Sequence, residues 1–189
     1  MVERYFKESA RLYSSILTNT DFLRRITEAV ELVVMCYESG KKLLVAGNGG
    51  SAADAQHFAA EFVGRYKRER KAYPAIALTT DTSILTAWSN DYEFASVFAR
   101  QIEAHAQSGD VFIGISTSGN SKNVTQAVEK AKAMGVKTIC LLGKGGGEVM
   151  NRADLSIVVP SDNTPRIQEV HTTILHIISE EVEQKLSRV

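Results

Sequence analysis

Residues 43–61 read LLVAGNGGSAADAQHFAAE, and this stretch sets the architecture of the whole chain. Leu43, Leu44 and Val45 form a short apolar run, which ends at a loop with three glycines and continues into alanine-rich sequence with helical character. The pattern predicts a buried strand, a tight turn and a helix. The other segments can be placed around this strand–turn–helix unit.

The glycine-rich loop has the chemistry of an anion site. Glycines let backbone amides approach a ligand without interference from a Cβ atom, and the first turn of the following helix offers unpaired N–H groups to an anion such as phosphate. The dinucleotide motif GxGxxG and the P-loop motif GxxxxGK[ST] are both missing from the sequence, which disfavours those two interpretations. The alternative to an anion site is that this loop is only a tight turn before a helix with exposed polar residues.

His57 and Glu61 are four residues apart, so on a helix they share one face. A phosphate cradle with a His/Glu pair one or two turns away suits chemistry on a small phosphorylated molecule.

The composition narrows the class of protein. A chain of 189 residues fits one domain, 1–189, with a helical pair in 1–40 and an α/β core in 41–189. Its 22 basic and 22 acidic residues balance, which favours neither nucleic-acid nor membrane-surface binding. The sequence contains no apolar run of membrane-spanning length and opens on no signal peptide, so we expect a cytoplasmic protein. Cys36 and Cys140 lie in apolar segments and are expected to be buried thiols.

Strands and helices are expected to alternate along the chain. The expected strands are 43–45, 75–80, 111–115, 137–142 and 155–159; the expected helices are 3–19, 21–39, the one after the glycine loop, a short one from 83, 92–106, 121–134 and 165–186. Residues 88–91 are expected to interrupt the helical pattern, 143–147 to form a flexible turn, and the basic run 65–71 to be a solvated connection rather than a phosphate or nucleic-acid patch. The alternation predicts a three-layer αβα sandwich with a five-stranded parallel, flavodoxin-like sheet, and ligands at the carboxyl ends of its strands.

A second cradle follows the apolar strand 111–115. Residues 116–121 read STSGNS, which brings the hydroxyls of Ser116, Thr117, Ser118 and Ser121 to the start of a helix. Hydroxyls and helix-terminal amides together favour phosphate. Ordinary serine capping explains one hydroxyl but not four.

The last expected helix carries three polar side chains among apolar ones. Gln168 and His176 are eight residues apart and lie close to the same face, whereas His171 lies well around the helix from His176. A single histidine in such an apolar helix is usually a core residue with its hydrogen bonds satisfied.

Taken together, these motifs resemble the sugar-isomerase (SIS) fold and, more narrowly, the phosphoheptose isomerase family. The resemblance spans nearly the whole chain and rests on GNGGS at 47–51, His57 and Glu61, Asn90-Asp91, STSGNS, and RIQE at 166–169 with His176. STSGNS alone indicates only a phosphosugar-binding SIS domain, and the combination is more specific. Pro165 departs from members that have Asp before RIQE, and we treat it as a subgroup marker.

The resemblance implies a homotetramer, with active sites at subunit interfaces, that converts sedoheptulose 7-phosphate into D-glycero-D-manno-heptose 7-phosphate for bacterial surface polysaccharide such as lipopolysaccharide. It implies substrate contacts by Asn48, Gly49, Gly50, Ser51, Glu61, Asn90, Asp91 and Gln168, and phosphate contacts by Ser116, Thr117, Ser118 and Ser121. It also implies a zinc ion, one per subunit, on His57, Glu61, Gln168 and His176.

Moving a carbonyl between C1 and C2 needs a base at carbon and an acid at the oxygens, and we expect Glu61 and His176 in those roles. Zinc could instead polarise the carbonyl, and the roles compete because a carboxylate bound tightly to zinc is a poorer base. Two other functions stay open. One is a non-catalytic SIS protein that binds the replication initiator. The family member with that role has Asn at the position of His176. The other is an isomerase of a different sugar phosphate.

Overall fold

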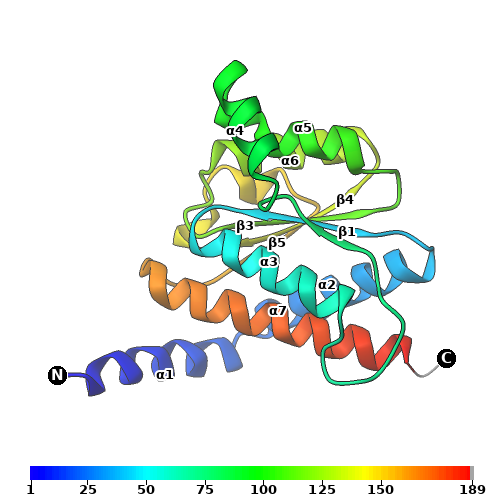
Figure 1. Ribbon diagram of the computed structural model, residues 1–189. Coiled ribbons are helices and arrows are strands. Elements are labelled where there is room, and N and C mark those ends of the chain that lie inside the picture. The colour runs from blue at the N-terminus through cyan, green and yellow to red at the C-terminus, as the bar shows by residue number, and fades with distance from the viewer. Residues whose placement is uncertain (188–189) are drawn as a thin grey trace.

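The computed structural model describes residues 1–187, in which helices cover both faces of a five-stranded parallel sheet (Figure 1). The strands are β1 (Leu43–Gly47), β2 (Ala75–Ala77), β3 (Val111–Ser116), β4 (Lys137–Leu142) and β5 (Leu155–Val158). The predicted three-layer αβα fold is confirmed. The last two residues of the predicted domain, 188–189, lie outside the described residues.

The strand order is β2-β1-β3-β4-β5, so the direction of winding reverses between β1 and β3. Ligands of open α/β sheets bind outside the carboxyl ends of the strands at such a reversal. Gly47, the last residue of β1, is in register with Ile115 of β3. The loops 47–51 and 116–121 therefore leave the sheet side by side, and both anion cradles lie at the reversal.

Two helical layers enclose the sheet. One contains α1 (Glu3–Leu17), α2 (Thr20–Glu38), α3 (Gly50–Val63) and α7 (Thr164–Leu186); the other contains α4 (Thr82–Asp91), α5 (Val97–His105) and α6 (Lys122–Ala133) (Figure 1). Short 3₁₀ turns occur at Phe94–Ser96, Lys144–Gly146 and Val149–Asn151. Within residues 1–187, no helix has the length and apolar character needed to span a bilayer.

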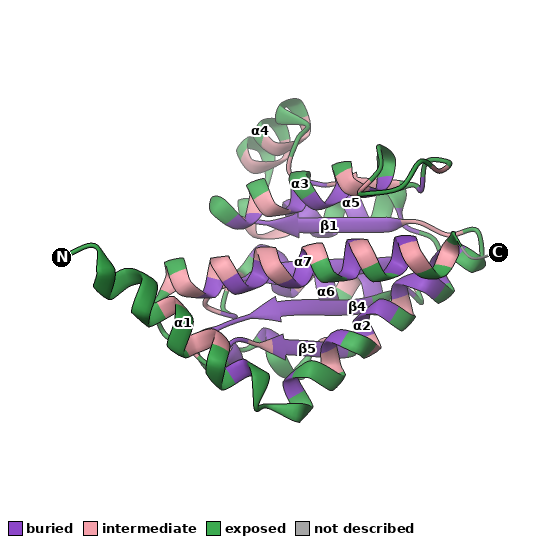
Figure 2. Ribbon diagram, turned by 90° about the horizontal axis from the view of Figure 1, so that it is seen from below, coloured by how far each residue is buried: buried purple, intermediate pink, exposed green. Residues whose placement is uncertain are grey.

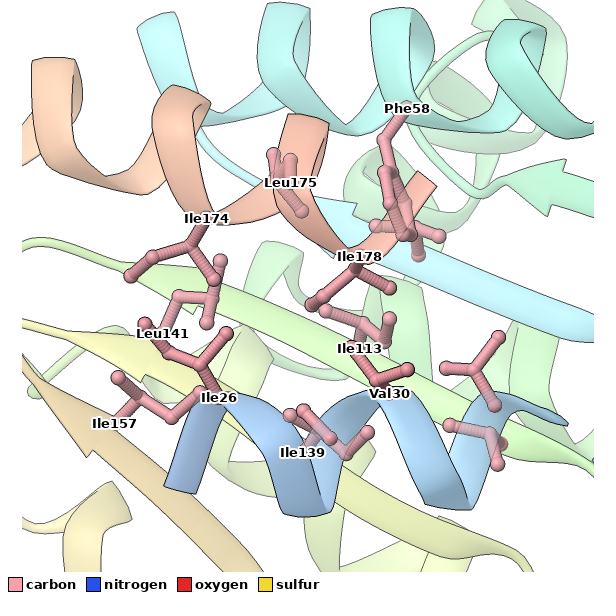
Figure 3. Close-up of a cluster of buried hydrophobic side chains, with 14 of the residues drawn as sticks. Ile26, Val30, Phe58, Ile113, Ile139, Leu141, Ile157, Ile174, Leu175 and Ile178 are labelled. Carbon is pink, nitrogen blue, oxygen red and sulfur yellow. The ribbon is translucent and has the colours of Figure 1, made fainter. Parts of the chain in front are cut away.

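The main core lies between the sheet and the layer of α2, α3 and α7 (Figure 3). Ile26 and Val30 of α2 and Ile174 and Ile178 of α7 pack on strand residues such as Ile113. Every residue of β1 and β3 is buried, as the burial colours show for β1 (Figure 2). Coverage on both faces explains why these strands are continuous apolar runs rather than alternating ones.

Three predicted boundaries in the region 75–106 are wrong. The strand expected over 75–80 ends at Ala77, because the chain turns at once and Asp81 caps α4 by accepting from the Ile84 amide at 3.0 Å. Residues 88–91, expected to interrupt the helix, complete α4 instead. The ring of Trp88 stacks on Tyr92 with 4.2 Å between ring centroids, which stabilises the end of this helix. The next helix, expected from residue 92, is α5 and follows a 3₁₀ turn.

The two N-terminal helices, α1 and α2, pack in different ways. Helix α2 begins one residue earlier than expected, at a cap formed by Asn19, and buries its apolar face against the sheet. Helix α1 buries only Ile16 among its residues. It is attached to α7 through polar contacts, including Tyr13 Oη to Thr173 Oγ1 at 2.7 Å.

Candidate active site

The STSGNS loop brings its hydroxyl groups together. The hydroxyls of Ser116 and Ser121 lie 2.9 Å apart, and Thr117 and Ser118 are half-buried on the same loop. Ser121 directly precedes α6, but its hydroxyl pairs with Ser116 rather than capping the helix. The amides of Lys122 and Asn123, in the first turn of α6, are thus left for a ligand, and capping does not account for this loop.

The glycine turn 143–147, expected to be flexible, is packed against this loop. A methyl group at Gly119, which has φ +65°, would overlap the carbonyl oxygen of Gly146. The amide of Val149 donates to the Gly119 carbonyl at 3.0 Å, and that of Glu148 donates to Asn120 Oδ1 at 3.0 Å. The glycines therefore serve a close approach of two loops, which fixes the shape of the cradle.

The first cradle lies at the start of α3. This helix follows Gly49, which has φ +57° and no side chain that could cap the amides. A methyl group at Gly50 would overlap the amide nitrogen of Gln168. The fold therefore places Gln168 of α7 against the glycine loop, although the two are far apart in sequence, with Asn48 half-buried and Ser51 buried beside it.

Helices α3 and α7 pack side by side and make a side-chain contact at each of three successive turns. We call this contact the α3–α7 seam. Gln168 lies on Gly50, Thr172 Oγ1 donates to Asp54 Oδ1 at 3.1 Å, and the rings of His57 and His176 meet edge to face with centroids 5.1 Å apart. Steps of three or four residues on each helix keep these side chains in one row. The seam is thus a polar row beside the apolar core that the same two helices form.

His57, Glu61 and His176 converge in the seam. His57 Nε2 lies 2.8 Å from Glu61 Oε1, and one ligating atom from each of the three residues lies within 4.8 Å of the others. Two imidazole nitrogens and a carboxylate oxygen are the donors that catalytic zinc sites use. The residue types and their spacing therefore fit such an ion, as the family resemblance implies for these three. Gln168 lies two turns along the same helix.

Asp54 is a residue of the seam that the sequence motifs did not single out. Burial raises the pKa of this carboxyl group, while the Thr172 hydroxyl and the nearby His57 and His176 act in the opposite direction. Asp54 thus faces both histidines. Asp54 is three residues before His57, which places both on the same helical face. This spacing is the signal from which Asp54 could have been predicted.

The basic run 65–71 is not wholly solvated as expected, because Arg70 is buried. Its side chain is only 5% exposed and Nε lies 2.9 Å from Oε1 of Glu183, which is 2% exposed. The Glu183 carboxylate also accepts from the amides of residues 66–68, and Arg70 Nη2 donates to the carbonyl of Glu61 at 2.6 Å. This Arg70–Glu183 clamp fixes the segment after α3 and brings the Tyr66 ring to 5.9 Å from that of His176.

The sequence candidates Asn90 and Asp91 lie apart from the seam, as does His171, which was not a site candidate. Asn90 and Asp91 are exposed at the end of α4, in the helical layer on the other face of the sheet (Figure 1). His171 is fully buried, and its Nε2 lies 3.0 Å from the Leu142 carbonyl oxygen. Burial lowers the pKa of His171 to about 4, so it is a neutral core residue, as expected from the sequence.

Comparison with known proteins places the chain in a family. The SIS domain model matches residues 4–143. The phosphoheptose isomerase of Citrifermentans bemidjiense is 63% identical over 161 residues, 85% of this chain and 84% of that one. That of Clostridium acetobutylicum is 51% identical over 185 residues, 98% of this chain and 94% of that one, so this match includes α7.

A solved structure agrees with these matches. The phosphoheptose isomerase of Neisseria gonorrhoeae superposes with a TM-score of 0.91 at 41% identity, covering 97% of each chain. The strand order, the two cradles and the α3–α7 seam described above are thus set in a fold shared over almost the whole length. The chain belongs to the phosphoheptose isomerase family of SIS-domain proteins.

Proposed function

We propose that this protein is an aldose–ketose isomerase that converts sedoheptulose 7-phosphate into D-glycero-D-manno-heptose 7-phosphate. The observation that carries the proposal is the convergence of His57, Glu61 and His176 in the α3–α7 seam, in a fold with two helix starts that no side chain caps. The names of the relatives support the heptose as substrate. A binding protein has no need of an acid–base cluster, and this disfavours the non-catalytic alternative.

In the proposal, each of the two cradles binds one end of the substrate. In the proposal, the phosphate lies among Ser116, Thr117, Ser118, Ser121 and the amides of α6, which supply neutral donors. The carbonyl end lies over Asn48, Gly49, Gly50, Ser51 and Gln168. The extended sugar then crosses the sheet edge from the end of β3 to the end of β1, the point at which the winding reverses.

The chemistry is a pair of proton transfers. Glu61 takes a proton from C1 of the ketose, the C1–H electron pair forms the C1–C2 double bond of an enediol, and O2 receives a proton from His176. The O1 proton then passes back to His176, the electron pair moves to C2, and Glu61 returns its proton there. Glu61 engages His57 through Oε1, which leaves Oε2 for carbon. Each positioned transfer contributes about 10²–10⁴-fold.

One zinc ion per subunit is part of the proposal, held by His57, Glu61, Gln168 and His176. When bound there, zinc would supply Lewis-acid polarisation of the substrate carbonyl in place of proton donation by His176. The chain's own residues orient the sugar and carry its protons.

The proposed assembly is a cytoplasmic homotetramer with active sites at its interfaces, whose product feeds surface polysaccharide such as lipopolysaccharide. Exposed apolar side chains support an association surface: Phe6 of α1 is 74% exposed, and Tyr92 and Phe94 are exposed next to Asn90 and Asp91. Because Asn90 and Asp91 are exposed beside this association surface, we assign them to the active site of a neighbouring subunit.

Substrate comparison tests the activity. The purified protein, supplied with zinc, is assayed with sedoheptulose 7-phosphate, fructose 6-phosphate and ribulose 5-phosphate. We expect the highest kcat/KM for the heptose. Preference for the hexose or pentose would assign a different sugar, and no turnover of any of the three by folded protein would contradict an isomerase.

A further inference from the structure

Asn123 is a buried polar residue with no role in the chemistry given above. It is the second residue of α6 and only 3% exposed. Its carboxamide pairs with that of Asn48: Asn48 Nδ2 donates to Asn123 Oδ1 at 2.9 Å, and Asn123 Nδ2 donates to Asn48 Oδ1 at 2.8 Å. The two residues are 75 positions apart in sequence.

The reciprocal pair joins the two cradles. Asn48 belongs to the glycine loop after β1, whereas Asn123 belongs to the helix whose first turn carries the phosphate loop. A carboxamide has two N–H donors and an acceptor oxygen with two lone pairs. The pair uses one N–H and one lone pair on each side, so Asn48 keeps one N–H and one lone pair for a ligand. Turning the Asn48 amide alone would bring oxygen to oxygen and nitrogen to nitrogen.

The pair also lines an open pocket. Asn48 and Asn123 contribute to its wall together with Phe94, Ala95, Ser121 and Lys122. Ser121 belongs to the phosphate cradle, so this pocket touches both the glycine loop and the phosphate loop. Asn48 is half-buried, and its unused N–H is the group available there.

We propose that Asn123 is a positioning residue for the isomerisation, acting through Asn48. It holds the Asn48 carboxamide in one orientation at a fixed place relative to the phosphate cradle. The sugar's carbonyl end is thereby aligned with Glu61 when its phosphate is seated. The inference rests on the proposed function, in which Asn48 contacts substrate.

The expected kinetic signature separates alignment from binding. Asn123→Leu has nearly the same size and removes both hydrogen bonds, which frees the Asn48 side chain. A misplacement of about 1 Å costs on the order of 10²-fold in rate, so we expect kcat to fall by about that factor. Inhibition by inorganic phosphate is expected to stay unchanged, because the four hydroxyls of the STSGNS loop remain.

Thr125→Val is the matched control on the same helix. Thr125 is buried, and its hydroxyl donates to the Ser121 carbonyl at 3.2 Å. Valine has nearly the same shape, so this replacement removes a buried polar group close to the cradle but leaves the Asn48–Asn123 pair intact. We therefore expect its kcat to equal that of the parent.

A double-mutant cycle shows whether Asn123 acts through Asn48. The four proteins are the parent, Asn123→Leu, Asn48→Leu and the double variant, each checked for Tm and oligomeric state. We expect Asn123→Leu to have no further effect on kcat once Asn48 is replaced. Equal losses in both backgrounds, or a loss of phosphate inhibition in parallel with kcat, would assign Asn123 a general structural role and overturn the inference.

If Asn123→Leu does not fold, Asn123→Ala takes its place, because it also removes both hydrogen bonds and adds no charge beside the phosphate cradle. A parent that fails to turn over the heptose phosphate would overturn the proposed function and this inference together. A parent that turns over while its Asn123 variants keep full kcat would overturn the inference alone.

Discussion

His57, His171 and His176 have the same type of side chain but lie in different surroundings. His171 is fully buried, and its Nδ1 has no hydrogen-bond partner among residues 1–187. His57 is half-exposed and pairs with Glu61. The helical angle between positions 171 and 176 predicted that these two rings lie on different sides of the helix, and the structure places His171 in the core and His176 in the seam.

The buried histidine makes stability depend on pH. Its folded-state pKa of about 4 lies below the ordinary value of 6.5, so the unfolded chain binds the proton more readily. The stabilisation is complete above pH 6.5 and is lost as pH falls toward 4, amounting to about 3 kcal/mol at 1.36 kcal/mol per pKa unit. Urea unfolding from pH 7 to 4 should show a shallower pH dependence for His171→Gln than for the parent.

The matched control is His105→Gln, since His105 is exposed at the end of α5. It should follow the parent curve. A His171→Gln curve that runs parallel to that of the parent would contradict this assignment.

Residues whose partners are distant in sequence could not be predicted. Helical spacing singled out His57 and Glu61, and the family resemblance added Gln168 and His176 as predicted site residues. The role of Asn123 and the burial of Arg70 were missed, because their partners Asn48 and Glu183 are 75 and 113 positions away. Neither pairing leaves a local pattern, and a basic run in isolation is typical of a solvated segment.

The α3–α7 seam, formed by two helices, depends on the Arg70–Glu183 clamp. Burial alone would raise the pKa of the Glu183 carboxyl group. The hydrogen bonds from the amides of residues 66–68 and the charge of Arg70 lower this pKa below its ordinary value. The carboxylate is thus held ionised in the interior, where it ties the segment after α3 to α7. The predicted helices were correct in kind, and this contact adds to the direct contacts that hold α3 against α7.

Glu183→Gln should destabilise the protein by about 3–5 kcal/mol, because it leaves Arg70 buried without a counter-charge and turns an N–H₂ group toward backbone donors. Glu180→Gln is the control, since Glu180 pairs with Lys67 at the surface and should cost less than about 1 kcal/mol. Chemical denaturation of both variants measures the difference. Equal small losses would mean that the clamp does not stabilise the seam.

Gly119→Ala tests the close approach behind the phosphate cradle. Both Gly119 and Gly145 have positive φ, but a methyl group meets the Gly146 carbonyl only at Gly119, since Gly145 has open space around its Cα. We expect Gly119→Ala to weaken inhibition by inorganic phosphate, whereas Gly145→Ala keeps it. A similar change in both would assign the effect to backbone strain alone.

In the molecule as a whole, the sheet gathers the functional loops at the reversal between β1 and β3. The parallel αβα class was predictable from alternating apolar strands and helices. The end of β2 and the extent of α4 were not, because a cap at Asp81 and the stacking of Trp88 on Tyr92 set them. The homotetramer that the family resemblance implies stays a prediction.

Association of subunits can be tested through α1. We expect sedimentation to show a tetramer, and Phe6→Glu to shift it toward smaller species, because the apolar side chain of Phe6 is largely exposed. If active sites lie at interfaces, activity should fall with the tetramer fraction. Lys7→Glu, at an exposed charged neighbour, is the control. A fully active monomer would contradict interface sites.

Proton exchange in heavy water shows whether the α3–α7 seam is the active site. With sedoheptulose 7-phosphate, the zinc-supplied parent should form the aldose and incorporate deuterium at C1 and C2. Glu61→Gln and His176→Gln should lose both turnover and exchange while keeping the parent's Tm and oligomeric state. Exchange and turnover that persist in the folded Glu61→Gln variant would contradict Glu61 as the base, and with it the assignment of the seam as the active site.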